Sequence, residues 1–359
     1  MNRLVGVLVA VIVLAALLAV GCNQGSASPT QAPSQTKAAE ATKAASPVSQ
    51  ATAQPTTASG GQVGFPDKGK TISLIVPFPP GGSTDVGARL LAPLMEKELG
   101  VPIQVVNKAG AGSQVGITEL AQSKPDGYTL AYTLLPATVT IYLDPERKAV
   151  FGRKDLQFVA THVSDPQVVA VAANSPYRTL QELLDAAKAN PEKIKASSVG
   201  VMGPEHLSIL QLQKAAGVKF AIVQFEGSAP ATSALLGGHT DFQLGTLGVF
   251  ASAYKNGQVR FLGVMDKEES RLLPGVKTTE SQGYKIYSYV TRVLSVPAGT
   301  PAPVVDVLSS AVKKAMETEE HKKKIEEMGM TLTYMGPDQT AAFWDDVETQ
   351  VKPLMELAK

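Results

Sequence analysis

The stretch that most constrains the fold is Ile72 to Asp85, with the sequence ISLIVPFPPGGSTD. It begins as an apolar, β-branched run and breaks at two prolines and two glycines. It ends in Ser83, Thr84 and Asp85, residue types that favour a helix start. Apolar residues then recur every three or four positions over 86–95. We expect a strand, a turn and a helix whose first N–H groups converge on one spot and favour an anion there.

Strand and helix patterns alternate from Phe65 onward, which predicts an α/β fold with mainly parallel sheets. A strand expected at 157–163 leads into a second apolar run at 168–173. The strand, Gly/Pro turn and helix of the opening stretch recur at 194–216. Two such units in the two halves of the chain suggest two lobes that face each other across a cleft.

Composition excludes several classes of function. The 359 residues suffice for two domains, and a net charge of +1 with 18% charged residues does not suggest a nucleic-acid partner. Cys22 is the single cysteine, and the four histidines show no metal-ligand spacing. We therefore expect no disulfide, no structural zinc and no cofactor.

The N-terminus carries the pattern of an export signal. Arg3 precedes an apolar run over 4–20, followed by Gly21 and Cys22. Residues 18–22, LAVGC, resemble a bacterial lipobox in which Cys22 becomes lipidated, although Ala19 stands where leucine is usual. The alternative is an uncleaved anchor helix. Both interpretations place the rest of the protein outside the cytoplasm and tether it to a membrane.

Residues 23–64 are rich in Ser, Ala, Thr, Pro and Gln and contain no aromatic side chain, so we expect a disordered tether. Residues 64–71, GFPDKGKT, fit the GxxxxGK[ST] phosphate-loop pattern letter by letter. That motif needs a strand before it and a helix after it. Here a tether precedes it and a strand follows, so a nucleotide site is not expected.

Six stretches match a known family in order and spacing. They are IVPFPPGGSTD (75–85), VNKAGAGSQVG (106–116), PDGYTLAYT (125–133), FEGSAPATSALLGGHTDF (225–242), SVPAGTP (295–301) and the Met328-Gly329 helix end. From about Pro66 to the C-terminus the chain resembles the extracytoplasmic substrate-binding proteins of tripartite tricarboxylate transporters, also called the Bug family.

The resemblance implies a two-lobed Venus-flytrap receptor of the type II periplasmic-binding class, with lobe I at 66–165 and 287–359 and lobe II at 166–286. Such a receptor is a monomer and not an enzyme. It captures a small carboxylate in the cleft and delivers it to membrane permease subunits. The carboxylate is held mainly by backbone amides and ordered water.

The resemblance also assigns the ligand-binding residues to four regions. The first loop holds Pro79, Gly81, Gly82, Ser83, Thr84 and Asp85, and the second loop holds Ser197, Gly200 and Gly203 with His206 behind it. The third region is Phe225, Gly227 and Ser228, and the fourth is Thr133, Ala137 and Thr138. The alternatives are that the glycines only form tight turns, that Ser197 only ends a strand, and that His206 is a packed or capping residue.

Two departures from the family pattern concern charge. Glu226 stands where the family often has a basic residue, and it either opposes a highly charged ligand or is a solvated surface residue. The basic residues of 147–154 are interpreted as a solvated loop. Two other functions stay open at this point: a ligand sensor for a signalling system, and an exported hydrolase, for which no GxSxG motif or metal cluster exists.

Overall fold

The computed structural model describes residues 64–357. The chain divides into two units, Met1–Ser59 and Gly60–Lys359, and only the second contains described residues. The expected export signal, its cysteine Cys22 and residues 23–63 of the expected tether lie outside the described part. Residues 64–71 form loop and turn and lead into a strand, so the phosphate-loop pattern lacks its helix, as predicted. Within 64–357 no helix combines the length and apolarity needed to cross a membrane.

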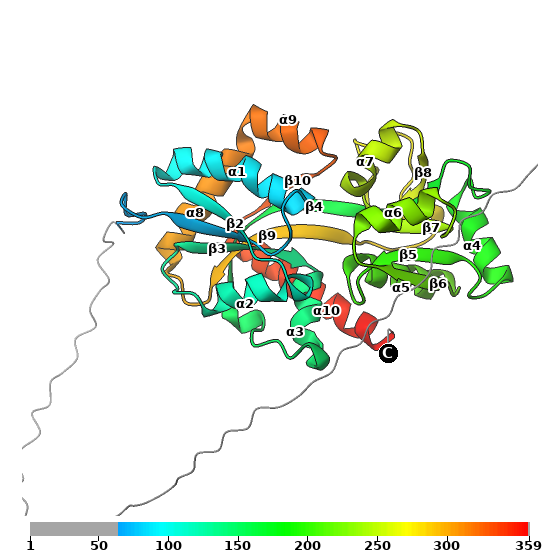
Figure 1. Cartoon of the computed structure of the whole chain (residues 1–359), viewed down its shortest axis with the longest axis horizontal. Helices are drawn as coiled ribbons and strands as arrows, with labels where there is room; N and C mark the ends of the chain where they lie inside the picture. The colour runs from blue at the N-terminus through cyan, green and yellow to red at the C-terminus, as the bar shows by residue number, and fades with distance from the viewer. Residues whose placement is uncertain (1–63, 358–359) are drawn as a thin grey trace, which may run out of the picture. The chain divides into compact units, whose positions relative to one another are not determined.

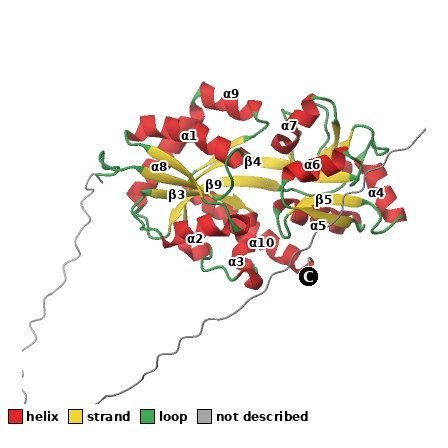
Figure 2. Cartoon of the chain, in the orientation of Figure 1, coloured by secondary structure: helices red, strands yellow, loops and turns green. Residues whose placement is uncertain are grey.

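Ten strands form one mixed sheet in the order β2-β1-β3-β9-β4-β7-β5-β6, with β10 and β8 also paired to β4. Helices lie on both sides of the strands (Figure 2). Strands β2, β1 and β3 run parallel in one half, and β6, β5 and β7 run parallel in the other. The strands are β1 (Ile72–Val76), β2 (Ile103–Asn107), β3 (Thr129–Leu135), β4 (Leu156–Ala172), β5 (Lys195–Val199), β6 (Ala221–Phe225), β7 (Phe242–Thr246), β8 (Val259–Val264), β9 (Tyr289–Pro297) and β10 (Leu332–Met335).

Helices cover both faces of each half, which confirms the two-lobed α/β fold. The helices are α1 (Ser83–Leu99), α2 (Gln114–Gln122), α3 (Ala137–Leu143), α4 (Leu180–Ala189), α5 (Pro204–Ala216), α6 (Ser228–Leu236), α7 (Leu247–Lys255), α8 (Ala302–Glu317), α9 (Glu319–Glu327) and α10 (Pro337–Leu357). In the first half α1 and α8 share one core, and α2, α3 and α10 share another. In the second half α4 and α5 pack on one side, and α6 and α7 on the other.

Strands β4 and β9, here called the crossing strands, connect the two halves (Figure 1). The strand expected at 157–163 and the apolar run at 168–173 are parts of one 17-residue strand, β4. Its residues up to Pro166 pair with β9, and from Gln167 onward it pairs with β7 and β8. The boundary between the lobes at 165/166 stays a prediction, and it falls next to this change of partner.

A buried ion pair joins the crossing strands. Arg292 of β9 donates from Nη1 to Asp165 Oδ2 of β4 over 2.6 Å, and the two side chains are 4% and 2% exposed. The other carboxylate oxygen of Asp165 accepts the Thr331 N–H at 2.6 Å. Burial raises the pKa of Asp165 although Arg292 and this N–H oppose the shift. The pair is therefore costly to desolvate, and each charge depends on the other.

A chain of buried polar rings lies in the first half. Tyr132 of β3 bonds His162 Nδ1 of β4 at 2.7 Å, and His162 Nε2 lies 2.8 Å from His321 Nε2 of α9. Burial, the neighbouring His321 and Arg292 hold the pKa of His162 well below its usual value. Burial and Lys324 lower the pKa of His321 to about 4. Both rings are therefore neutral at pH 7.

Because these rings are buried and neutral, we predict that the free energy of unfolding falls in acid. The folded pKa of His162 lies below the unfolded value of about 6.5, so its contribution is complete above pH 6.5 and falls as the pH drops further. The expected slope is about 1.4 kcal/mol per pH unit for this fully buried ring. His162→Gln should reduce the slope of unfolding free energy between pH 7 and pH 5, measured by urea titration. The exposed His239 supplies the control, because His239→Gln should keep the wild-type slope. Equal slopes in the two variants would contradict the assignment.

The ion pair predicts a large cost for losing one partner. Arg292→Met leaves Asp165 buried and unpaired and should lower the free energy of unfolding by about 3–5 kcal/mol. Arg153→Met removes the more exposed pair with Asp345 and should cost about 1 kcal/mol or less. Denaturant titration of both variants at pH 7 checks the difference. The prediction is wrong if the two substitutions cost the same.

Candidate functional site

The four predicted regions lie where parallel strands end and helices begin. The first loop follows β1 and opens α1, and the fourth region spans the end of β3 and the start of α3. The second loop joins β5 to α5, and the third joins β6 to α6. The carboxyl ends of parallel strands are where open α/β sheets usually bind ligands. The two regions of each lobe are neighbours, because β1 pairs with β3 and β5 pairs with β6.

The first loop exposes backbone at the start of α1. Residues 79–83 are exposed, and Gly81 has a φ of +86°, which a side chain would strain. Gly82 caps α1 with an extended backbone and has no side chain to bond the first N–H groups of the helix. These N–H groups lack intrahelical partners and carry the positive end of the helix dipole. The loop therefore presents an uncapped anion-favouring end.

Asp85 bonds groups of the protein itself, and its part in ligand binding stays a prediction. It is 2% exposed, and its carboxylate accepts hydrogen bonds from the Gly81 N–H at 2.8 Å, from Asn107 Nδ2 at 2.9 Å and from Arg89 Nε at 3.1 Å. Burial alone would raise its pKa, but the bonds from Arg89, Gly81 and Asn107 outweigh burial and lower it. The carboxylate thus folds the loop back onto the first turn of the helix.

Arg292 fixes the start of α1 from behind. Its Nη2 donates to Ser83 Oγ at 2.9 Å, and its Nε donates to Thr84 Oγ1 at 3.3 Å. The hydroxyls of the first loop are therefore tied to a crossing strand. Sequence analysis missed this arginine, although a charge within the buried strand β9 is itself an unusual signal.

The second loop also ends in an uncapped helix. Gly200 has a φ of +73°, and Gly203 caps α5 with extended backbone and no side-chain bond. A Cβ on Gly203 would lie 2.5 Å from the Val199 carbonyl oxygen, so only glycine fits there. His206 Nδ1 accepts the Met202 N–H at 3.0 Å, and burial lowers the pKa of its ring. The ring is neutral and stabilises the loop, with Nε2 carrying its proton.

The third region touches the second directly. The Gly200 N–H donates to the Phe225 carbonyl oxygen at 3.2 Å. Gly227 caps α6, again without a side-chain bond, and Ser228 begins the helix. Glu226 between them is exposed. Side chains cap α4 and α9, through Thr179 and Thr318, whereas α2, α3, α7 and α8 also begin without a side-chain cap bond.

Three predicted polar residues have hydroxyls that the protein itself uses. Thr133 Oγ1 bonds Ser295 Oγ at 2.7 Å. Thr138 Oγ1 accepts the Leu134 N–H at 3.1 Å, and Ser197 Oγ bonds Thr240 Oγ1 at 2.7 Å. Thr133, Thr138 and Ser197 are fully buried, and Ala137 beside them is half-buried. Their part in ligand binding stays a prediction.

The basic stretch 147–154 contacts the protein surface at two points. Arg147 donates to the Ala111 carbonyl oxygen at 3.0 Å, and Arg153 pairs with Asp345 of α10 at 2.7 Å. Neither arginine donates a hydrogen bond to any of the four predicted regions. These contacts give the stretch a structural role on the outside of the lobe.

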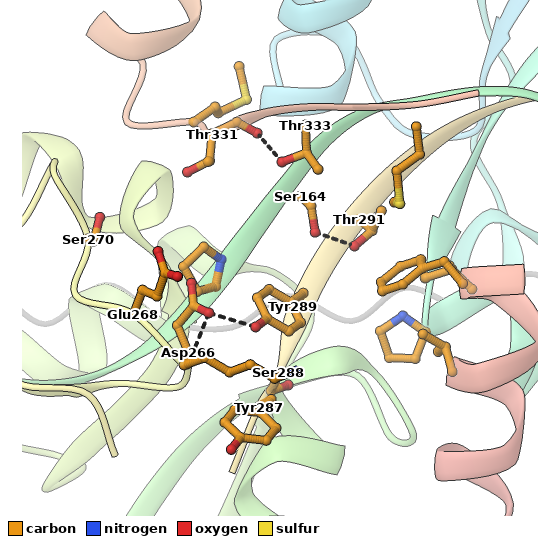
Figure 3. Close-up of a pocket in the computed structure, with 18 of the residues that line it drawn as sticks. Ser164, Asp266, Glu268, Ser270, Tyr287, Ser288, Tyr289, Thr291, Thr331 and Thr333 are labelled. Carbon is orange, nitrogen blue, oxygen red and sulfur yellow. Dashed lines mark hydrogen bonds between the residues drawn. The ribbon is translucent and has the colours of Figure 1, made fainter. Parts of the chain in front are cut away.

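A cavity of about 840 Å³ lies against the other face of the crossing strands (Figure 3). Ser164 and Thr291 line it and bond each other at 2.7 Å, while their chain neighbours Asp165 and Arg292 pair on the opposite face. None of the predicted site residues lines this cavity. Five acidic side chains line it against three basic ones, which disfavours a carboxylate ligand. Its acidic residues are Asp266, Glu268, Glu269, Glu326 and Asp346.

Comparisons with a family model and with individual proteins identify the same family. A family model described as "Tripartite tricarboxylate transporter family receptor" matches residues 87–358. A UPF0065 protein encoded in the gbd 5′ region of Cupriavidus necator is 32% identical over 297 residues, covering 81% of this chain and 88% of that protein. Protein BugT of Bordetella pertussis is 29% identical, covering 77% and 86%.

A solved structure agrees with the fold. MatC from Rhodopseudomonas palustris with bound malate is 26% identical and superposes with a TM-score of 0.70, covering 79% of this chain and 98% of that one. Members of the family are solute-binding receptors and not enzymes. The chain described here belongs to the receptor family of tripartite tricarboxylate transporters.

Proposed function

We propose that this receptor captures a small organic acid between its lobes and delivers it to the permease subunits of a tripartite tricarboxylate-type transporter. One observation carries the proposal. Helices α1, α5 and α6, from both lobes, begin at glycine caps with no side-chain bond, and all three follow parallel strands. The free N–H groups at the starts of α1 and α6 suit a carboxylate, whereas the first turn of α5 already contains the carboxylate of Glu205.

The geometry explains why few charged side chains are needed. A carboxylate accepts several N–H bonds at once, and such charge-assisted bonds are stronger than neutral ones. Closure of the two lobes would exclude water and strengthen these bonds further. No bond in the ligand is broken, so release only requires the lobes to open.

The relatives support the class of ligand. MatC, which shares the fold and 26% of its residues, is described with bound malate. From that protein we infer for this receptor only that the ligand has a carboxylate group. Backbone N–H groups bind a carboxylate whatever the rest of the ligand is. We further propose that the receptor works outside the cytoplasm, held at the membrane by a lipid on Cys22.

The proposal predicts stabilisation by organic acids. At a hundred times Kd, a ligand that binds only the folded state stabilises it by about 2.7 kcal/mol. A panel of mono-, di- and tricarboxylates that includes malate should therefore contain acids that raise the melting temperature of the full-length chain. A panel without any such acid would contradict the proposal.

Gly82→Val tests the first loop within this panel. The Gly82 backbone is ordinary extended structure (φ −74°, ψ 163°), and the nearest atom to an added Cβ is the Pro79 carbonyl oxygen at 3.8 Å. The fold should survive, while the valine methyls crowd the N–H groups and weaken acid binding by about tenfold or more. Gly152→Val, at another extended cap outside the four regions, should bind as the wild type does. Calorimetric titration of both variants checks this, and equal affinities would exclude the first loop from the site.

A further inference from the structure

Glu205 is a buried acid without a cationic partner. It is the second residue of α5, two positions after the Gly203 cap, and is 9% exposed. Among residues 64–357 no lysine, arginine or histidine lies within 4.0 Å of its carboxylate, and its hydrogen bond is to its own backbone N–H. Burial raises the pKa of Glu205 to about 7. The carboxylate therefore lies in the first turn of α5, the helix that follows the second loop.

The elements around the start of α5 supply no charge to balance it. Strands β6 and β7 and the turn before α5 have no ionisable side chain, and Lys195 of β5 is exposed at the opposite end of that strand. On α10, Lys352 pairs with Glu348, and Glu356 is exposed. His206 is neutral, as described above.

The crossing strands and β5 add buried polar groups but no buried unpaired charge. Asp165 and Arg292 neutralise each other. Gln167 Oε1 and Ser198 Oγ are buried and have no hydrogen-bond partner among the described residues. Ser198 lies on the sheet face that packs against α5, as its neighbour two positions earlier, Ala196, does. The crossing strands therefore supply no cation that would balance the charge of Glu205.

The two loops thus differ in electrostatic character. Near the first loop every charge is paired, Asp85 with Arg89 and Arg292 with Asp165, whereas Glu205 in the first turn of α5 has no cationic partner among the described residues. We propose that Glu205 makes the second loop select against a second carboxylate, so that the ligand has one carboxylate on the first loop and a neutral or hydrogen-bond-donating end facing α5. This inference rests on the proposed function and narrows its ligand class.

The sign of the pH dependence follows from repulsion between like charges. Glu205 takes up its proton below about pH 7, and only the protonated form tolerates a second carboxylate nearby. A dicarboxylate should therefore bind about tenfold more weakly at pH 8 than at pH 6, since one proton must be taken up. An acid with a neutral end should bind equally at both values.

The experiment compares pairs of acids that differ only in the charge of one end. Succinate is compared with its monoamide succinamate, and adipate with adipic acid monoamide, by calorimetric titration of the full-length chain at pH 6 and pH 8. Glu205→Gln, which mimics the protonated side chain, should give the dicarboxylates equal affinity at both pH values. Circular dichroism at pH 8 checks that this variant is folded.

Glu226→Gln is the matched control, because Glu226 is an exposed acid next to Gly227. It should keep the wild-type pH response. The inference is overturned if dicarboxylates bind equally at both pH values, if the response survives in Glu205→Gln, or if Glu226→Gln removes it. If neither the diacids nor the monoamides bind at either pH, the proposed function fails as well; binding of monoamides and diacids without a pH response overturns only the inference.

Discussion

The buried pair of Asp165 and Arg292 is the interaction on which the arrangement of the site depends. It joins the two crossing strands, and the same guanidinium holds the hydroxyls of Ser83 and Thr84. The strands that connect the lobes and the start of α1 are therefore fixed by one group. Because both charges are desolvated, neither can be removed without leaving the other unpaired. This makes the pair a weak source of net stability and a strong constraint on geometry.

The charges near the site mostly serve the protein. Asp85 folds the first loop, Arg292 holds it, and the His206 ring holds the second loop. What stays available at the three glycine-capped helices is backbone. Backbone N–H groups bind any carboxylate, so selectivity among different organic acids must come from a few side chains. Among the residues of α5, Glu205 is the side chain that is buried, ionisable and without an ionic partner.

Elements with strong local signals were predictable. The strand–turn–helix unit expected at 72–95 is formed by β1 and α1, and the unit expected at 194–216 is formed by β5 and α5. The short helices α3, α6 and α7 and the four-residue strand β10 were not predicted. The sequence of α6, SAPATSALL, consists mostly of small residues with little amphipathic period, so its helix depends on packing against the sheet. The long strand β4 contains the polar residues 164–167, which interrupt its apolar pattern.

By itself the sequence determined the two strand–turn–helix units, the glycine caps and the family, because these depend on residues adjacent in the chain. Tertiary structure alone decided which polar groups have partners. Arg292 meets Asp165 across 127 positions and Thr84 across 208, and the sequence contains no local pattern for such contacts. The same holds for Glu205, since burial and the lack of a cation are set by the elements packed around α5. Residues adjacent in the chain therefore determine the conformation of the loops, whereas long-range packing determines which charged side chains near them have partners.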